Sequence, residues 1–310
     1  MSRSLAIKYL LLSVKSSVIA LLILIKLGTL RFYSKNMCMN ALICPLCALP
    51  LSENSQGLTC FNRHQFDRAK EGYFNLLPVH HKNSREPGDA KQQLVARRAF
   101  LAAGYFLPLV DALKKVISSD VENLLDIGCG EGYFTRLFQE HCCGADVYGL
   151  DISKAGVRLA AKSNLQNVTY LVASSHSLPL ADASMDVITR IYAPSKDEEL
   201  LRVLKPAGKL IIVTPGEQHL LALRQKIYQT IKPHPKPVAP RGFNELKQGS
   251  VCFPLSVPAG DLTASLLTMT PFAWRLSPVL LHSSIKDGID DTAHFQVSVY
   301  EKRQDGEVFA

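Results

Sequence analysis

Residues 124–135 read LLDIGCGEGYFT and join an apolar run, a glycine-rich turn and the start of an amphipathic segment. Glycine is found in such turns where the backbone bends sharply or approaches a ligand closely. The order strand, glycine turn, helix is typical of the first crossover of an open α/β sheet, whose ligands bind at the carboxyl ends of the strands. This stretch therefore predicts a doubly wound α/β sheet with a ligand over the turn.

The spacing of the glycines indicates which ligand. A dinucleotide fingerprint requires a third glycine at position 133, where this chain has Tyr133. The pattern is D-x-G-x-G-x-G instead, and its first acid is suited to meet the ammonium group of S-adenosylmethionine (SAM). A second predicted strand ends at Asp151, a position from which an acid accepts hydrogen bonds from ribose hydroxyls. A SAM site is predicted, with a NAD site or a structural turn as alternatives; its residues are Asp126, Gly128, Gly130 and Asp151.

The rest of the chain continues the alternation that a doubly wound sheet requires. We expect helices over 153–164 and 196–204, and strands over 168–172, 185–192, 209–215 and 295–301, the last as the closing edge strand. The expected ligand contacts lie at the carboxyl ends of these strands, at 128–135, 151, 173–174, 191–194 and 216–219.

A second motif, CPLCALPLSENSQGLTCFNRH over 44–64, holds three cysteines and a histidine. Zinc prefers four thiolate or imidazole ligands in a tetrahedron, and a C-x-x-C turn places two sulfur atoms on one side of the ion. Residues 52–57, between the two ligand pairs, are typical of a hairpin turn. A closed set of four ligands leaves no open coordination position, so we expect a structural metal. The predicted zinc ligands are Cys44, Cys47, Cys60 and His64.

Disulfides or incidental buried cysteines are the alternative to zinc. The remaining cysteines show no metal spacing and are expected to be structural or neutral; they are Cys38, Cys129, Cys142, Cys143 and Cys252. A module of some 30 residues buries too little apolar surface to fold unaided, so the metal is expected to hold a small recognition module together.

Residues 1–40 differ in composition from the rest. They hold six basic and no acidic residues, so they carry most of the formal net charge of +8 and leave only +2 for the remainder, which is weak support for a nucleic-acid partner. The apolar run at 18–25 is shorter than the roughly 20 residues of a bilayer span. We interpret this segment as an over-extended start, with translation beginning at Met37 or Met39; a weak membrane anchor and a signal peptide are the alternatives. We expect a cytoplasmic protein without stable membrane association.

Several motifs together make the chain, from about Ala41 to its end, resemble the bacterial 23S rRNA guanine-N1 methyltransferases; they are CPLC, CFNRHQFDRAKEGYFNLLP, SREPGD, RRAFL, DIGCGEGYFT, VASSHSLP, RIYAP and MTPFAW. The resemblance implies a small N-terminal zinc ribbon joined to a class I (Rossmann-like) methyltransferase domain, SAM as methyl donor, and a homodimer. The implied substrate is N1 of a guanine in a 23S rRNA hairpin near the peptide exit tunnel. The expected division is an extension 1–40, a ribbon 41–75, a linker and helical segment 76–115, and a methyltransferase domain 116–310.

The resemblance also implies individual cofactor contacts. Phe106 stands where the family has a tyrosine near SAM, so ring packing replaces a hydroxyl contact. Phe134 and Thr135 match the helix start beside the methionine part, and His219 matches a histidine near the cofactor. Ala207 stands where methyltransferases often have a second glycine, a departure that concerns turn geometry more than chemistry.

Methylation of guanine N1 requires an unpaired or flipped base and the loss of the N1 proton. No acid directly follows the strand predicted over 185–192, where the chain reads IYAP. Tyr192 and Pro194 are instead expected to wall the base pocket, with Tyr192 stacking on the base. The proton acceptor is left open among four candidates, Asp182, Asp186, His176 and His219.

Residues 61–98 carry eight basic and four acidic residues, interleaved with Phe61, Phe66, Tyr73 and Phe74. Arginine and lysine contact phosphates, and exposed aromatic rings stack on bases, so this segment predicts an RNA-reading surface. A solvated polar face with the aromatics in a small ribbon core explains the pattern about as well. Two other functions stay open, a small-molecule SAM methyltransferase of the same fold and a non-catalytic zinc-ribbon RNA-binding protein.

Overall fold

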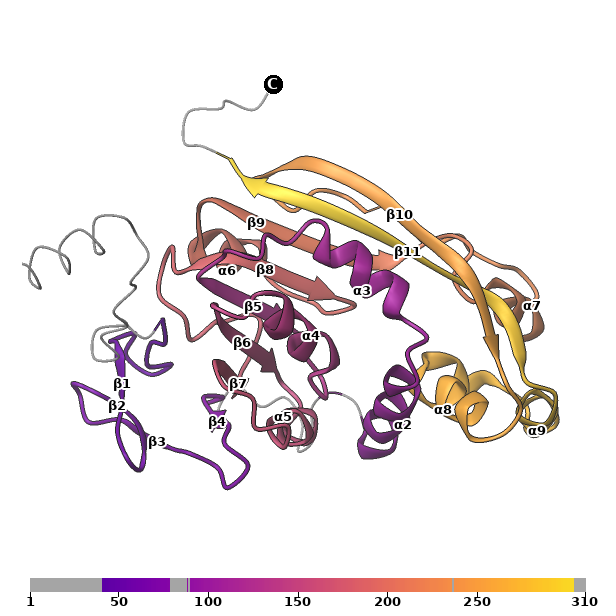
Figure 1. Cartoon of the computed structure of the whole chain (residues 1–310), viewed down its shortest axis with the longest axis horizontal. Coiled ribbons are helices and arrows are strands. Elements are labelled where there is room, and N and C mark those ends of the chain that lie inside the picture. Colours follow the sequence, from indigo (N-terminus) through magenta and orange to yellow (C-terminus); the bar gives the residue numbers. More distant parts are fainter. Residues whose placement is uncertain (1–40, 79–87, 89, 236, 304–310) are drawn as a thin grey trace, which may run out of the picture. The chain divides into compact units, whose positions relative to one another are not determined.

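A computed structural model describes residues 41–78, 88, 90–235 and 237–303, with elements labelled as in Figure 1. Contacts divide the chain into the units Met1–Asn40 and Ala41–Ala310, and the second unit is the one described here. The predictions for residues 1–40, with Cys38, lie outside the described residues, as do Lys82 and Arg85 of the basic segment. Among the helices that are described, none has both the length and the apolar character to cross a bilayer.

The first part of the unit is a three-stranded antiparallel sheet in the order β1-β2-β3, formed by β1 (Leu51–Glu53), β2 (Gly57–Cys60) and β3 (Gln65–Asp67). The turn between β1 and β2 forms because the Asn54 side-chain oxygen accepts from the amides of Gln56 and Gly57, each at 2.9 Å. This confirms the predicted hairpin turn. The turn brings the segment around Cys60 back beside the one that follows Cys44.

An eight-stranded sheet forms the body of the unit, in the order β10-β11-β9-β8-β5-β6-β7-β4 (Figure 1). Its strands are β4 (Phe74–Asn75), β5 (Asn123–Ile127), β6 (Asp146–Asp151), β7 (Val168–Val172), β8 (Met185–Ile191), β9 (Leu204–Pro215), β10 (Phe243–Val257) and β11 (Ile289–Lys302). The strands from β4 to β9 are parallel to their neighbours, and β11 and β10 pair antiparallel. Because the chain leaves β5 toward β6 and later returns to β8 on the other side, β5 and β8 form a topological switch point.

Helices separate the strands, as the doubly wound prediction requires. They are α2 (Lys91–Ala102), α3 (Leu107–Lys114), α4 (Tyr133–His141), α5 (Lys154–Ala161), α6 (Asp197–Val203), α7 (Leu221–Ile227), α8 (Asp261–Met269), α9 (Pro278–Asp287) and the 3-10 helix η2 (Pro271–Arg275). The predicted helices at 153–164 and 196–204 correspond to α5 and α6, so both are confirmed.

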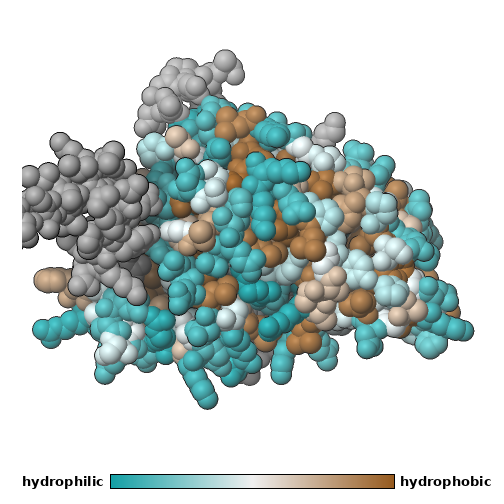
Figure 2. Space-filling view, in the orientation of Figure 1, coloured by the Kyte–Doolittle hydropathy of each residue, from teal (hydrophilic) through white to brown (hydrophobic). Residues whose placement is uncertain are grey.

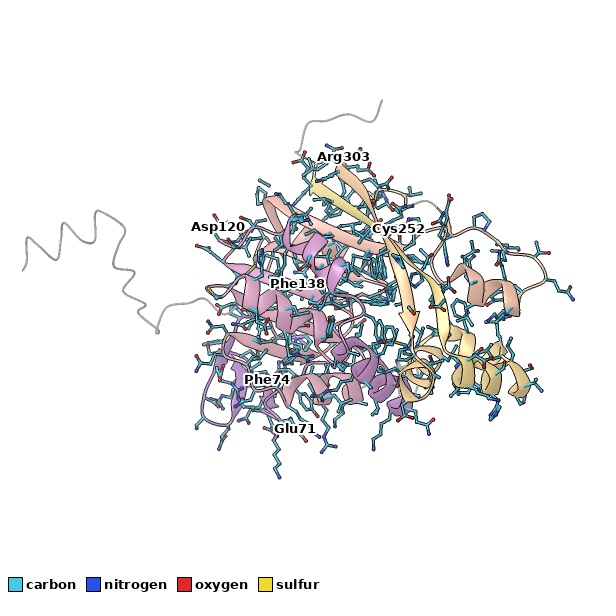
Figure 3. The ribbon with its side chains drawn as sticks, turned by 45° about the vertical axis from the view of Figure 1, so that its right-hand side comes forward. Glu71, Phe74, Asp120, Phe138, Cys252 and Arg303 are labelled. Atoms are coloured by element: carbon cyan, nitrogen blue, oxygen red, sulfur yellow. The ribbon has the colours of Figure 1, made fainter. Side chains whose placement is uncertain are left out.

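The strands are buried on both faces because their apolar residues alternate between two clusters. Leu124 and Val147 belong to a cluster with α3 and α4, whereas Leu125 and Tyr148 belong to a cluster on the opposite face. α3 and α4 lie over the sheet in Figure 1. Phe138 of α4 lies inside the molecule, whereas Asp120 and Arg303 lie near its edges (Figure 3). In the view of Figure 2, hydrophilic residues cover most of the surface and hydrophobic ones gather over α3 and its neighbours.

The ribbon packs directly onto the large sheet. Leu42, Leu51 and Leu58 belong to the same buried cluster as residues of β5, β6 and β8. The Ile43 amide donates to the Pro179 carbonyl at 3.0 Å, and the Ala181 amide donates to Ala41 at 2.7 Å. Backbone hydrogen bonds and shared apolar burial therefore hold the ribbon in one position against the sheet.

Two strands differ from the sequence expectation. The predicted closing strand at 295–301 is part of β11, but β11 lies inside the sheet and β10 is the edge. β10 contains Gly249 and Pro254, and proline within a strand is tolerated at a sheet edge, which is where β10 lies. β4, which falls in the expected ribbon 41–75, adds a further parallel strand beside β7.

Candidate cofactor site and metal centre

The glycine turn follows β5 directly. Gly128 has φ +74°, and a Cβ atom on it would lie 2.4 Å from the Ala193 side chain after β8, so both conformation and space require glycine. Gly130 has φ +55°, and apart from its chain neighbours the nearest described group that a Cβ atom there would meet is the Arg97 guanidinium at 3.4 Å. Among the described residues, the turn is therefore packed against the segment after β8 and less crowded above Gly130.

Asp151 connects this turn to β6. Its carboxylate accepts hydrogen bonds from the Gly130 amide at 2.9 Å and from the Ser153 amide at 2.7 Å. The two bonds place the carboxylate at the carboxyl end of β6 beside the glycine turn, the position expected for an acid that binds ribose hydroxyls. A carboxylate has about four lone-pair directions, so it can accept more hydrogen bonds than these two.

Asp126 lies beneath the turn and is only 2% exposed. Its carboxylate accepts from the Thr135 hydroxyl at 2.6 Å and from the Thr189 hydroxyl at 2.9 Å. Burial raises the pKa of Asp126 to about 6, and the two hydroxyl bonds partly offset that effect. Asp126 and Thr135 are thus brought together, with the threonine fully buried as a partner of the acid.

Four aromatic rings form a connected cluster between the start of α3 and the carboxyl ends of β8 and β9. The Phe106 ring lies 5.0 Å from the Phe295 ring, which lies 4.9 Å from the His219 ring and 6.3 Å from the Tyr192 ring. Phe106 and Phe295 are buried, whereas Tyr192 is 50% exposed. Tyr192 also has φ +55°, which is rare for an aromatic residue and indicates a conformation held by its surroundings. Phe134 packs separately, against Tyr133 and Phe138 of α4.

His219 is held in a neutral state. Its Nδ1 accepts from the His294 amide at 3.2 Å, which assigns the ring proton to Nε2. The pKa of His219 is lowered to about 4, mainly by burial and also by the nearby charges of His234, His294 and Arg224. An imidazole in this state donates a hydrogen bond from Nε2 and is poorly suited to take a proton from guanine N1.

The two aspartate candidates for proton acceptor lie away from this edge. Asp186 is the second residue of β8, at the end opposite to Tyr192, and its carboxylate accepts from the Asn123 amide and pairs with Lys205 at 2.8 Å. Asp182 precedes β8 and pairs with Arg202 at 2.9 Å. Both carboxylates form ion pairs away from the glycine turn. Neither is therefore placed to accept the guanine N1 proton. His176 lies exposed in the loop after β7.

The four predicted metal ligands come together. Cys44, Cys47, Cys60 and His64 offer ligand atoms that all lie within 4.8 Å of one another. The Cys47 and Cys60 sulfurs are 3.7 Å apart, and His64 Nδ1 lies 3.4 Å from the Cys44 sulfur and 3.5 Å from that of Cys60. Tetrahedral zinc, with Zn–S of about 2.3 Å and Zn–N of about 2.0 Å, gives ligand–ligand edges of about 3.5–3.8 Å, so the donor set fits this metal.

The disulfide alternative does not fit these cysteines. A disulfide requires sulfurs about 2.05 Å apart, and the cysteines of the cluster are free. Burial raises the pKa of the Cys44 thiol to about 11, so a thiolate there needs a cation to compensate the loss of hydration. A bound divalent metal supplies that charge.

The basic segment predicted to contact RNA is only partly exposed. Tyr73 and Phe74 are buried, and Arg68 lies over the Phe74 ring at 4.6 Å while it pairs with Glu53. Phe61 is 92% exposed, between the ligands Cys60 and His64. Of the four interleaved aromatics, Phe61 alone is therefore presented to solvent as a large exposed ring.

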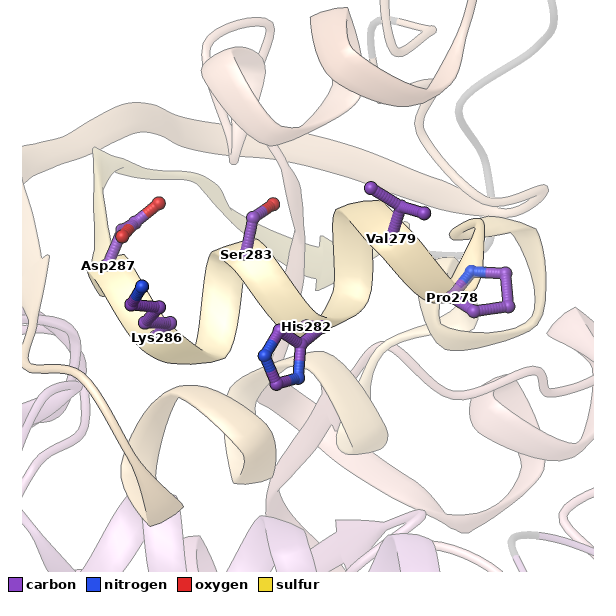
Figure 4. Close-up of a pocket in the computed structure, with 6 residues that line it drawn as sticks. All are labelled: Pro278, Val279, His282, Ser283, Lys286 and Asp287. Carbon is purple, nitrogen blue, oxygen red and sulfur yellow. The ribbon is translucent and has the colours of Figure 1, made fainter.

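A surface groove of about 540 Å³ lies elsewhere, along α9. Its lining residues Pro278, Val279, His282, Ser283, Lys286 and Asp287 all come from that one helix (Figure 4). A groove with one wall buries little of a small ligand. None of the predicted site residues contributes to it.

Three residues near the site were not among the contacts expected from the sequence. Arg97 comes from α2, Phe295 from β11 and Thr189 from β8, all distant in sequence from the glycine turn. Only Arg97 carried a signal, since it lies in the RRAFL motif.

Comparisons with known proteins agree with this arrangement. A zinc-ribbon family model described as "RlmA, N-terminal" matches residues 42–85, and one described as "Methyltransferase domain" matches residues 125–212. A SAM-dependent methyltransferase structure from Aquifex aeolicus is 17% identical, covers 69% of this chain and 100% of that chain, and has a TM-score of 0.42. The two family models alone place a zinc ribbon before a methyltransferase domain in this chain.

Two curated relatives carry the comparison further. The "23S rRNA (guanine(748)-N(1))-methyltransferase" of Streptomyces fradiae is 33% identical over 185 residues, which cover 58% of this chain and 65% of that protein, slightly less than two thirds of its length. The "Putative 23S rRNA (guanine-N(1)-)-methyltransferase YxjB" of Bacillus subtilis (strain 168) is 31% identical over 265 residues, which cover 74% of this chain and 86% of that protein. With this coverage and both domains in place, the chain belongs to the family of the 23S rRNA (guanine-N(1)-)-methyltransferases.

Proposed function

We propose that this protein uses SAM to methylate N1 of a guanine in a hairpin of 23S rRNA near the peptide exit tunnel. One observation carries the proposal: a Cys₃His cluster that fits zinc is packed on the same sheet that holds the glycine turn. A small-molecule methyltransferase has no use for an exposed aromatic ring between two metal ligands. An RNA-binding protein without activity has no use for an open turn beside a positioned acid.

In this proposal the ribbon comprises residues 41–75 and the methyltransferase domain residues 116–310, joined by a linker and helical segment at 76–115. The zinc ligands are Cys44, Cys47, Cys60 and His64. The protein acts as a homodimer in the cytoplasm, where ribosomal RNA is its partner.

SAM would be held over Gly130, with Asp151 accepting from its ribose hydroxyls and Asp126 supplying negative charge near its ammonium group. Gly128 would let the turn pack closely against Ala193 beside the bound ligand. Phe106 would act through the ring contact with Phe295, and His219 would lie beside the cofactor. When bound, SAM supplies an electrophilic methyl group on a sulfonium.

The protein's own residues contribute by positioning the target base relative to the methyl donor. Guanine N1 takes part in base pairing, so the base must be unpaired or flipped, at a cost of a few kcal/mol in unstacking. The half-exposed Tyr192 ring offers a stacking surface that offsets part of this cost. SAM would supply the methyl group, and the residues around the turn would align its sulfonium with guanine N1, whose proton would pass to solvent water. Alignment of donor and acceptor supplies much of the acceleration.

The test is direct. The full chain is incubated with labelled SAM and 23S rRNA from a strain that lacks the enzyme, and the modified base is mapped by reverse transcription, which an N1 methyl group stops. We expect label in the RNA and a stop at one guanine. The guanine equivalent to position 748, named for the Streptomyces fradiae relative, is the first to examine.

Other outcomes would overturn the proposal and distinguish between the two alternative functions. Label in a small molecule but none in RNA indicates the small-molecule enzyme, and no SAM binding by calorimetry indicates the non-catalytic protein. Deletion of residues 41–75 is not a suitable control, because it removes Leu51 and Leu58 from the core of the sheet. Substitution of Phe61 perturbs the ribbon surface without that damage.

A further inference from the structure

The C-terminal part of the chain continues beyond the carboxyl end of β9. The last residue of β9, Pro215, pairs with Phe295, whereas residues 289–294 of β11 and 252–257 of β10 pair with each other past that point. α8, η2 and α9 connect these two strands, so they lie on the carboxyl side of β9 (Figure 1). Tyr192 follows β8 on the same side of the sheet, so an RNA that brings a base to Tyr192 would approach these helices.

η2 is held in place by its neighbours. It packs against α7 and α8, and α8 packs against α2. The Tyr228 ring, directly after α7, lies 6.3 Å from the Phe272 ring of η2, and the Arg275 guanidinium lies 5.5 Å from the centre of the Tyr228 ring. Side chains that η2 exposes are therefore presented from a fixed backbone.

Trp274 is the side chain that η2 presents to solvent. It is 79% exposed, whereas Phe272 and Leu276 on either side of it pack against the buried cluster that contains Leu266 and Leu267 of α8. Tryptophan is on average highly buried, because its large ring gains free energy by leaving water. A tryptophan ring held so far out of the core is available to stack on a flat ligand.

The segments that carry this surface are basic. Residues 218–242 contain five lysine and arginine residues and no acid, and residues 262–286 contain two and no acid. The exposed members are Lys226, Lys232, Arg241, Arg275 and Lys286. The flanking acids are Glu217, Asp261 and Asp287. Asp291 of β11 is engaged with α7, since its carboxylate accepts from the Ala222 and Leu223 amides at 3.2 and 2.8 Å. Positive charge beside an exposed aromatic ring is complementary to a nucleic acid.

From this arrangement we infer that the α7–η2 surface, formed by Lys226, Lys232, Trp274 and Arg275, is a second contact for the substrate RNA. Trp274 stacks on an unpaired base, and the three cations bind phosphates. The inference rests on the proposed function, since it takes the 23S rRNA hairpin as the RNA. Bases within a duplex are already stacked on their neighbours, so the ring selects an unpaired nucleotide.

A second copy of the chain is the other occupant to consider for this surface. A two-fold contact brings the same patch of both copies together. It would place the like charges of the two α7–η2 surfaces against each other, which is unfavourable. The charge therefore favours RNA over a second copy.

The chain allows this contact to be observed without a mutation. Trp274 is its single tryptophan, so the tryptophan fluorescence of the full chain reports on this ring alone. The protein is titrated with a 23S rRNA hairpin that contains the guanine equivalent to position 748, and with a fully paired RNA duplex of the same length. We expect the hairpin to quench the fluorescence, because a base stacks on the ring, and the duplex to quench it much less.

Variants separate the ring from the charges. Trp274→Ala is expected to weaken hairpin binding about 5- to 150-fold, and Trp274→Phe to keep most of the affinity. Val279→Ala, at an exposed apolar residue of α9, is the matched control and should bind as the wild type does. Arg275→Gln should reduce the slope of log affinity against log salt concentration by about 0.7–0.9, the value for one phosphate contact. Affinity for S-adenosylhomocysteine should be unchanged in all four variants.

Three outcomes would overturn the inference. One is equal quenching by the hairpin and the duplex, and another is unchanged hairpin affinity in Trp274→Ala. The third is a smaller oligomer in Trp274→Ala, measured by sedimentation, with unchanged RNA affinity, which would assign the surface to a second copy. A wild type that methylates the hairpin while its fluorescence stays unquenched refutes the second contact alone. If the wild type neither binds nor methylates the hairpin, the proposed function itself fails.

Discussion

The Thr135 hydroxyl donates a hydrogen bond of 2.6 Å to the carboxylate of Asp126, and both residues are buried beneath the glycine turn. Thr189 donates to the other carboxylate oxygen, so the acid is held from α4 and from β8 at once. Asp126, the acid that the sequence pattern assigns to the ligand, therefore also holds the start of α4, the helix that follows the turn.

We predict a specific pH dependence of stability from Asp126. Its pKa rises from 3.8 to about 6 in the folded state, so between about pH 4 and pH 6 the folded protein keeps a proton that the unfolded chain has lost. The free energy of unfolding therefore falls as pH rises through this range, by up to about 3 kcal/mol. Asp126→Asn is expected to remove this decrease, measured by urea unfolding at several pH values. Asp120→Asn, an exposed acid whose pKa is lowered, serves as control. Parallel curves for wild type and Asp126→Asn would refute the assignment.

Removal of the metal is expected to destabilise the large sheet as well as the ribbon. Cys47→Ser should reduce the zinc content from one per chain, measured by mass spectrometry of the metal. Since Leu51 and Leu58 share a core with the sheet, the melting temperature should fall by about 5 °C or more, at about 2–4 °C per kcal/mol. Cys143→Ser, at an exposed cysteine outside the cluster, should change neither. Full stability of a zinc-free protein would contradict the structural role.

Phe61 is expected to stack on an unpaired base of the RNA. Phe61→Ala should weaken binding to the 23S rRNA hairpin about 5- to 150-fold, because stacking of a base on an aromatic ring contributes about 1–3 kcal/mol. Affinity for S-adenosylhomocysteine should not change. Val238→Ala, at another exposed apolar residue, is the control. Filter binding of the labelled hairpin gives the RNA dissociation constants of the two variants. Equal affinity of Phe61→Ala and Val238→Ala for the hairpin would exclude the stacking role.

Tyr192 is expected to contribute a ring rather than a hydroxyl. Tyr192→Phe should keep methylation within a few-fold of the wild type, whereas Tyr192→Ala should lower it about tenfold or more by removing the stacking surface. Initial rates with saturating SAM provide the measurement. A large loss in Tyr192→Phe would instead assign a role to the phenolic oxygen.

Ala207 carries conformational strain that a single substitution should relieve. It has φ +61° at an exposed position near the start of β9, and the left-handed conformation costs an alanine about 1–2 kcal/mol. Ala207→Gly should raise the free energy of unfolding by about 1 kcal/mol. Ala259→Gly, at an exposed alanine without positive φ, should lower it slightly. Thermal unfolding distinguishes the two variants, and a fall in stability for Ala207→Gly would show that Ala207 carries no conformational strain.

The sequence alone determined the features that depend on residues close together in the chain. The glycine turn, Asp126 and Asp151 were predictable because a strand, a tight turn and a helix impose fixed spacings. The metal cluster was predictable because its two ligand pairs each occupy one short turn, and the Asn54 hairpin joins them. The strand at 168–172 was predicted with its observed bounds.

Only the tertiary structure decided the contacts between distant segments. It brought Arg97 to Gly130 and Phe295 to His219, and it turned Asp186 into a partner of Lys205. It also buried Tyr73 and Phe74, whose pattern in the sequence suits a core as well as an RNA surface. Pairing between strands and packing between helices depend on summed burial over the whole unit, which no local spacing encodes.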